Sequence, residues 1–184
     1  MKIKLSRVLC ASFLLAGCVA NPPVNQESAA QIKSASKVSR DEFRKITTVD
    51  AQKVAFTNIP WWDTGLDEGL FWLSAAKKDG DPSASLSLMF KTTRGNAWGW
   101  ASWEAAFDES GLQLPVTKIA SEVGDGGITY ELIAVEVTRQ FLDAHGTTGA
   151  RLRIDGRRAK KEISLPPNYV AAFLEKAEAT FSSK

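Results

Sequence analysis

Short runs of alternating apolar residues, separated by sequences that favour tight turns, constrain the fold of this chain most strongly. Leu86, Leu88 and Phe90 alternate with smaller or polar residues, which is typical of a strand with one buried face. The apolar run at 70–77 ends in a strong turn sequence at 78–82, Lys-Asp-Gly-Asp-Pro. Repetition of this pattern predicts consecutive strands joined by hairpins, and not the βαβ rhythm of a parallel sheet.

The other expected strands have the same character, and they are residues 54–58, 97–107, 112–123, 128–138, 151–155 and 158–165. The strand at 128–138 is apolar on both faces, so we expect it to lie centrally. Pro115 places its own strand at an edge or a bulge, and Asp155-Gly156 predicts a tight hairpin. The predicted fold class is mainly β, an antiparallel β-sandwich or curled meander of about eight strands.

Helices are expected at three places. Ser39 to Glu42 has the spacing of a capping box and predicts one helical turn, and Arg139 to His145 predicts a short helix ended by Gly146. Pro166 and Pro167 suit the start of a C-terminal amphipathic helix, which we expect to cover one face or edge of the sheet. Its apolar stripe is Val170, Phe173, Leu174, Ala177 and Phe181.

The composition limits the kinds of site that the chain can build. Its 184 residues, 44% hydrophobic and 24% charged, fit one ordinary globular domain. Two Cys and one His cannot build a Cys-rich zinc site or a disulfide framework, and no metal or other cofactor is expected. We expect His145 to be structural. No catalytic residue is assigned, because no serine lies in a G-x-S-x-G sequence and the glycines lack nucleotide-binding spacing.

The N-terminus has the pattern of an export signal. Lys2, Lys4 and Arg7 precede the apolar run Val8 to Gly17. These ten residues are too few to cross a hydrocarbon core, which needs about 20 helical residues. The run ends in Leu15-Ala16-Gly17-Cys18, which resembles the lipobox of bacterial lipoproteins.

This resemblance implies cleavage before Cys18, attachment of diacylglycerol to the Cys18 sulfur, and acylation of the new amino terminus with a fatty acid such as palmitate. Two or more acyl chains give stable anchoring, whereas one binds only weakly. Residue 19 is Val and not Asp, which points to the outer membrane of a Gram-negative envelope, with the domain facing the periplasm or the cell surface. The whole chain is similar to small envelope lipoproteins of such bacteria, a likeness that transfers no active residue.

We therefore expect three segments in the chain: a signal peptide at 1–17, a lipidated Cys with a flexible tether at 18–38, and a single β-rich domain at 39–184. The tether is rich in Asn, Pro, Gln, Ser and Ala and buries too little to offset its ordering entropy. A spacer is favoured, a partner-binding segment is the alternative, and residues 26–36 could form a short helix. Removal of the signal lowers the basic residues from 23 to 20 against 21 acidic ones, so no binding to nucleic acid is expected.

The chain has six tryptophans, which are candidate binding residues. Trp98 and Trp100 would share one face of a strand, where two indoles could stack on a sugar ring. Core filling is nevertheless the favoured role for both, as it is for Trp72 and Trp103.

Trp61 and Trp62 are expected in a loop, either exposed as a contact site or folded over the end of the sandwich as a plug. Neighbouring Asp63, Asp67 and Glu68 could supply the two carboxylates of a glycosidase, about 5–10 Å apart. A solvated acidic loop explains these carboxylates as well.

Six cations crowd the last expected hairpin, namely Arg151, Arg153, Arg157, Arg158, Lys160 and Lys161. This patch could meet lipid phosphates, lipopolysaccharide or an acidic partner. A charged edge that prevents sheet-to-sheet aggregation is the favoured interpretation.

The sequence therefore predicts a membrane-anchored envelope lipoprotein that acts as a binding or assembly module and not as an enzyme. Its expected partners are the membrane, through the anchor, and envelope proteins or glycans. The candidate binding residues are Trp61, Trp62, Trp98, Trp100, Arg151, Arg153, Arg157 and Arg158. A glycan- or peptidoglycan-binding module with exposed Trp is the alternative, and a carboxylate-based hydrolase is disfavoured.

Overall fold

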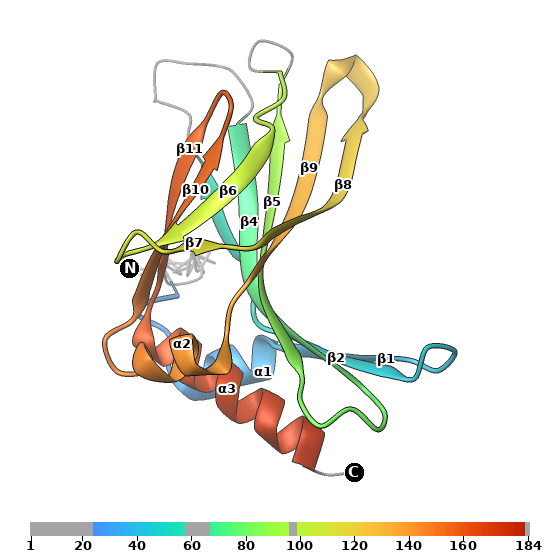
Figure 1. Cartoon of the computed structure of the whole chain (residues 1–184), viewed down its shortest axis with the longest axis vertical. Coiled ribbons are helices and arrows are strands. Elements are labelled where there is room, and N and C mark those ends of the chain that lie inside the picture. Colours follow the sequence, from blue (N-terminus) through green and yellow to red (C-terminus); the bar gives the residue numbers. More distant parts are fainter. Residues whose placement is uncertain (1–23, 58–66, 96–98, 183–184) are drawn as a thin grey trace, which may run out of the picture.

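The computed structural model describes residues 24–57, 67–95 and 99–182. Within these ranges the chain forms two antiparallel sheets, with helices gathered at one end of the molecule (Figure 1). The larger sheet has the order β1-β2-β4-β5-β9-β8, and β3 pairs with β4 as well. The smaller sheet has the order β11-β10-β6-β7.

The strands have the following bounds. In the larger sheet they are β1 (Lys37–Asp41), β2 (Ile46–Asp50), β3 (Val54–Thr57), β4 (Asp67–Lys78), β5 (Ser85–Arg94), β8 (Val116–Val123) and β9 (Thr129–Glu136). In the smaller sheet they are β6 (Trp103–Asp108), β7 (Gln113–Leu114), β10 (Ala150–Gly156) and β11 (Lys160–Leu165). A mainly β, two-sheet antiparallel fold with a C-terminal helix is therefore confirmed.

The described residues form 11 strands where about eight were expected. The additional strands include β1, all of whose residues are exposed, and β7, which has two residues. Neither carries an alternation of buried and exposed positions long enough to be recognised from the sequence.

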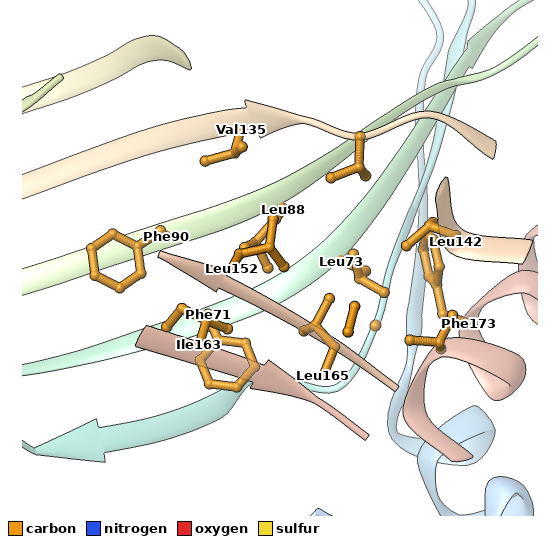
Figure 2. Packing of buried hydrophobic residues seen from close by; sticks show 14 of the residues in the cluster. Phe71, Leu73, Leu88, Phe90, Val135, Leu142, Leu152, Ile163, Leu165 and Phe173 are labelled. Atoms are coloured by element: carbon orange, nitrogen blue, oxygen red, sulfur yellow. The ribbon is translucent and has the colours of Figure 1, made fainter. Parts of the chain in front are cut away.

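The hydrophobic core lies between the two sheets. Phe71 and Leu73 of β4 and Phe90 of β5 face the smaller sheet, which contributes Leu152 of β10 and Ile163 of β11 (Figure 2). The alternating burial along β5 and β10 produces this inner face, as the sequence pattern predicts.

Trp72 and Trp103 are both buried, as expected. Trp103 packs edge-on to Phe90 with ring centres 5.0 Å apart, and its Nε1 donates to Thr92 Oγ1 at 3.0 Å. Trp72 follows Phe71 on β4, so it points to the opposite face of the larger sheet. There its Nε1 donates to Asp50 Oδ1 at 3.2 Å.

Three helices cover one end of the sandwich: α1 (Ala29–Ala35), α2 (Arg139–Ala144) and α3 (Pro167–Ser182) (Figure 1). The predicted stripe of α3 is buried except for Phe181, which is partly buried. Tyr169 of α3 donates its hydroxyl to the Gln52 carbonyl at 2.7 Å and accepts the Leu73 N–H at 3.3 Å. Burial raises the pKa of this hydroxyl well above its usual range.

The prediction of a flexible tether up to residue 38 is wrong from Val24 onwards. Ile32 of α1 is fully buried, and α1 packs against α3. Asn168 Nδ2 donates to the carbonyls of Val24 and Glu27 at 3.0 and 2.6 Å. One apolar side chain supports little on its own, but α3 supplies a surface that buries it, so tertiary packing stabilises this short helix.

The predicted capping box at Ser39 is also wrong, because these residues belong to β1 and pair with β2. A capping box does exist further upstream, where Ser28 Oγ accepts the Gln31 N–H at 3.3 Å and the Gln31 side chain accepts the Ser28 N–H at 2.8 Å. Both sites satisfy the same sequence spacing, and strand pairing decides between them.

The strand expected at 97–107 begins only at Trp103. Gly99 and Ser102 have left-handed backbone, with φ of 55° and 54°, which ends extended structure before β6. The last hairpin is confirmed, but its connection is wider than Asp155-Gly156. Asp155 pairs with Lys160, and the Gly156 N–H donates to the Ala159 carbonyl at 2.8 Å.

Two other predictions about strand position are confirmed. The strand β9 lies centrally between β5 and β8. Pro115 lies where the chain leaves β7 in the smaller sheet and enters β8, which is an edge strand of the larger sheet.

Candidate functional site

The end of the sandwich opposite the helices gathers several of the predicted binding residues. Figure 1 shows the tips of the β8–β9 and β10–β11 hairpins at this end, together with the start of β6. The segment Gly99–Ser102, which precedes β6, is held here by contacts to both sheets. It brings together an indole and cations from three parts of the chain.

Glu131 of β9 attaches this segment to the larger sheet. Its side chain is 2% exposed, and its carboxylate accepts the Ala101 N–H at 2.8 Å and the Ser102 N–H at 3.0 Å. A carboxylate that receives two backbone N–H groups in a buried position makes short, charge-assisted hydrogen bonds. Glu131 therefore fixes the backbone that leads into the left-handed residue Ser102.

The β10–β11 loop attaches to the same segment from the smaller sheet. The backbone N–H groups of Arg157 and Arg158 donate to the carbonyls of Ser102 and Ala101, each at 3.2 Å. Gly156 lies so close that a Cβ there would come within 2.5 Å of the Ala101 carbonyl oxygen. The loop is therefore seated against 101–102 by its backbone, which leaves both arginine side chains available to the surface.

As a result, one cation lies near the Trp100 ring and two more lie beside the segment that carries it. Lys118 Nζ of β8 lies 5.9 Å from the centre of the Trp100 ring, within the range of a cation–π contact. The guanidinium of Arg158 borders Gly99, since a Cβ built on that glycine would lie 3.5 Å from Arg158 Nη1. Arg157 is 73% exposed and pairs with Glu104 of β6. We call Trp100, Lys118, Arg157 and Arg158 the loop-end surface.

The other predicted arginines lie elsewhere. Arg151 and Arg153 point outward from the middle of β10 while Leu152 is buried, as expected. Arg153 Nε pairs with Asp155 at 3.1 Å and its guanidinium lies 5.0 Å from the Phe107 ring centre. The basic hairpin is thus divided: its tip belongs to the loop-end surface, and its strand cations lie on the outer face of the smaller sheet.

Several predicted residues fall outside the description. Trp61, Trp62, Trp98, Asp63 and Cys18 lie outside the described residues. The backbone of Asp67 begins β4, but its side chain is not among the described ones, and Glu68 is exposed. The paired carboxylates of the hydrolase hypothesis and the Trp61-Trp62 contact site therefore stay predictions.

The prediction that Trp98 and Trp100 share one face of a strand is wrong for Trp100, which precedes β6 and lies in no strand. Trp72 does not offer an open face for a sugar ring either. It is 7% exposed, and Lys53 Nζ lies 4.4 Å from its ring centre. The half-buried Trp100 is the indole of the candidate surface.

Two residues that position the loop-end surface carried no recognisable signal in the sequence. Lys118 reads as an ordinary edge lysine, and its bulged strand decides that it reaches Trp100. Glu131 is one acid within an apolar strand. Because a buried carboxylate needs hydrogen-bond partners, an acid in a strand expected to be buried indicates that donors from another part of the chain contact it.

His145 has the structural role that was expected for it at the end of α2. Its Nδ1 lies 2.8 Å from the Phe141 carbonyl oxygen, and its ring lies 4.5 Å from the Phe141 ring centre. Across residues 24–57, 67–95 and 99–182, no three His, Cys, Asp or Glu side chains are placed to hold a metal ion. In the same part of the chain no helix combines the length and apolar character needed to span a bilayer.

No protein-family model, curated protein or solved structure matches the chain.

Proposed function

We propose that this chain is a lipid-anchored envelope protein whose β-sandwich binds an acidic envelope partner through the loop-end surface. The anchor is argued from the basic start, the short apolar run and Leu15-Ala16-Gly17-Cys18. The binding role is argued from the loop-end surface, and the two parts can be tested separately.

The observation that carries the binding role is the backbone attachment of the β10–β11 loop to 101–102. It places the side chains of Arg157 and Arg158 next to the segment that carries Trp100, while Lys118 approaches the same indole from the other sheet. Cations on and beside the segment of an aromatic ring favour a ligand that offers negative charge and a flat or apolar face. Guanidinium groups are also well suited to carboxylates and phosphates, which they bind with two parallel hydrogen bonds.

An acidic glycan is the second candidate function, and the half-buried indole at the centre of the surface favours it. A sugar ring bearing a carboxylate or phosphate would stack against Trp100 and pair with the adjacent arginines. This version needs one accessible indole and not the pair expected from the sequence.

The anchor is tested by mass spectrometry of protein purified from native membranes. The N-terminal peptide should begin at Cys18 and carry the mass of a diacylglycerol and an additional acyl chain. Replacement Cys18→Ala should abolish this modification and block cleavage. An unmodified Cys18 thiol, or an intact Met1, would overturn the anchor.

Binding is tested by titrating the protein with polygalacturonate, lipopolysaccharide core oligosaccharide, neutral dextran and an acidic peptide. The double replacement of Arg157 and Arg158 by Ala should weaken binding of an acidic ligand at least about tenfold, equivalent to about 1.4 kcal/mol. The matched control replaces Arg151 and Arg153 by Ala, which removes the same charge from the same hairpin and should change affinity little. Equal losses in both variants would contradict the loop-end surface and indicate a general charge effect.

A further inference from the structure

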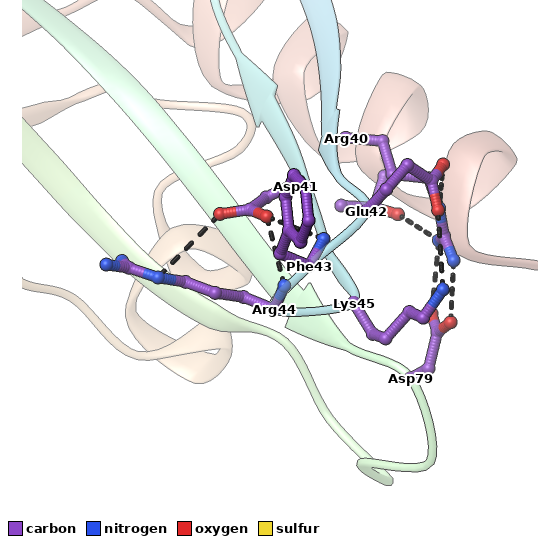
Figure 3. Close-up of polar contacts among 8 residues, drawn as sticks. Arg40, Asp41, Glu42, Phe43, Arg44, Lys45 and Asp79 are labelled. Atoms are coloured by element: carbon purple, nitrogen blue, oxygen red, sulfur yellow. Dashed lines mark hydrogen bonds and ion pairs between the residues drawn. The ribbon is translucent and has the colours of Figure 1, made fainter.

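The β1–β2 hairpin extends from the helix-covered end of the molecule (Figure 1). Phe43 lies in the turn between these two strands. Phe43 is 100% exposed, the extreme among the large hydrophobic residues described as exposed. Full exposure of a phenyl ring costs apolar hydration energy, and exposed aromatics often mark contact sites. Figure 3 shows the side chains around this tip.

The tip holds Phe43 in a defined conformation. Asp41 Oδ1 accepts the N–H groups of Phe43 and Arg44, each at 3.0 Å. The Asp79 N–H donates to the Lys45 carbonyl at 2.9 Å, and Arg40 donates to both carboxylate oxygens of Asp79 at 3.2 and 2.7 Å. The hairpin tip is thereby tied to the β4–β5 turn, and the ring is presented by an ordered backbone.

The charges beside the ring are balanced. Arg44 pairs with Asp41 at 3.7 Å, and Lys45 pairs with Glu42 at 3.6 Å. All four side chains are exposed, Arg44 to 79%. Two cations and two anions give this tip no net attraction to an anionic surface. They match a layer that itself contains both charges, such as the phosphate and ammonium groups of zwitterionic lipids.

The position of the hairpin relative to the proposed anchor supports a membrane as the partner. The described chain begins at Val24, which is bound to Asn168 at the start of α3. Five residues separate Cys18 from Val24, so their Cα atoms are six steps apart and lie at most about 20 Å from each other when the chain is extended. Figure 1 shows α1, α3 and the β1–β2 hairpin at the same end of the molecule. The anchor would therefore hold this end close to the bilayer.

We propose that the β1–β2 tip is a second membrane contact, in which Phe43 enters the interface of a zwitterionic leaflet while Arg44 and Lys45 reach lipid phosphates. This inference rests on the proposed lipid anchor. It gives the molecule an orientation: the helix-covered end faces the bilayer and the loop-end surface faces away from it. Burial of the phenyl ring should contribute about tenfold or more to the population of the docked orientation.

The test uses the full lipidated protein in lipid-only vesicles of phosphatidylethanolamine and phosphatidylcholine. Once the signal is removed and Cys18 carries lipid, an introduced cysteine is the one thiol to label. An environment-sensitive fluorophore that itself carries one negative charge, attached to Glu42→Cys, lies beside Phe43, leaves that ring in place and keeps the charges of the tip balanced. The same fluorophore on Asp125→Cys, in the 3-10 turn between β8 and β9 at the far end, is the matched control.

We expect the probe at position 42 to shift to the blue and to be quenched by lipid-borne quenchers, and the probe at 125 to remain in water. The additional replacement Phe43→Ser should return the probe at 42 to water. Adding phosphatidylglycerol or salt should change little, because the tip charges are balanced.

Three results would overturn the proposal. The first is a water-exposed probe at 42 in protein whose lipid is verified by mass spectrometry, which would leave the proposed function intact. The second is shielding that requires anionic lipid and disappears in salt. The third is shielding in native membranes but not in lipid-only vesicles, which would indicate a protein partner. Absence of lipid on Cys18 would instead remove the proposed anchor itself.

Discussion

Removal of the Glu131 carboxylate should release the segment that carries Trp100. In Glu131→Ala, the N–H groups of Ala101 and Ser102 lose their acceptor at a buried position. Each unsatisfied N–H costs about 1–3 kcal/mol, so the free energy of unfolding should fall by about 2–6 kcal/mol. This is a large part of the 5–15 kcal/mol that is typical of a whole domain.

Glu131→Gln keeps the shape of the side chain and one carbonyl oxygen. It should therefore cost about 1–3 kcal/mol, because one N–H keeps an acceptor while the other meets an amide donor. This variant keeps the prediction testable if Glu131→Ala does not fold. Glu136→Ala removes an exposed carboxylate from the same strand and should stay within about 0.5 kcal/mol of the parent protein.

Urea denaturation measures the free energy of unfolding, and hydrogen exchange followed by NMR reports the Ala101 and Ser102 amides directly. In Glu131→Gln these two amides should exchange about tenfold or more faster, while amides in β10 change less. Unchanged exchange at both amides, together with a loss below about 0.5 kcal/mol, would refute the argument that this carboxylate holds the loop end.

Three further predictions follow from single contacts. Tyr169→Phe should lower the free energy of unfolding by about 1–3 kcal/mol, since the Leu73 N–H and the Gln52 carbonyl each lose a hydrogen-bond partner. Because burial raises the pKa of the Tyr169 hydroxyl, the parent protein should keep its full stability below pH of about 10 and lose stability above it. Denaturation of the variant should depend less on pH in this alkaline range. Gly149→Ala should lower the thermal stability measured by calorimetry more than Gly80→Ala does. Both glycines have left-handed φ, but only at position 149 would the added Cβ meet backbone, 2.7 Å from the Leu165 carbonyl oxygen. Equal losses of stability in the two variants would contradict this. Hydrogen bonds from the Ser110 hydroxyl and then from the Leu112 and Ser110 N–H groups lower the pKa of Asp108. The contribution of Asp108 to stability should therefore be present above pH of about 4 and be lost in acid. If Asp108→Asn unfolds in acid with the same pH dependence as the parent protein, this prediction is contradicted.

The strands that the sequence predicted well are those whose burial alternates. In β5 and β10 one face meets the core and the other meets solvent, so the pattern is local and visible in the residues. The C-terminal helix was equally visible from its spacing. Three strands were not predicted as such. β1, and the two-residue β7 inside the strand expected at 112–123, depend on pairing with neighbours and carry no such pattern. β2 was also missed although its burial alternates, because that alternation covers only five residues.

The candidate site was predictable in kind but not in arrangement. The sequence singled out Trp100 and the arginines of the last hairpin as binding residues. It could not show that 156–158 docks on 101–102, since that contact joins residues more than 50 positions apart through backbone groups that every residue possesses. It also placed Trp98 and Trp100 on one strand, which the left-handed backbone at Gly99 prevents.

By itself, the sequence determined the antiparallel, mainly β fold class, the helix that ends the fold and the expectation of a lipid anchor, because these depend on residues that are close together in the chain. The tertiary structure alone decided that Ile32 has a surface to bury against, that Glu131 receives two distant N–H groups and that Phe43 has no neighbour to cover it. The physical reason is common to the three. The burial and hydrogen bonding of a side chain depend on which distant surface comes to lie against it, and local periodicity does not contain that information.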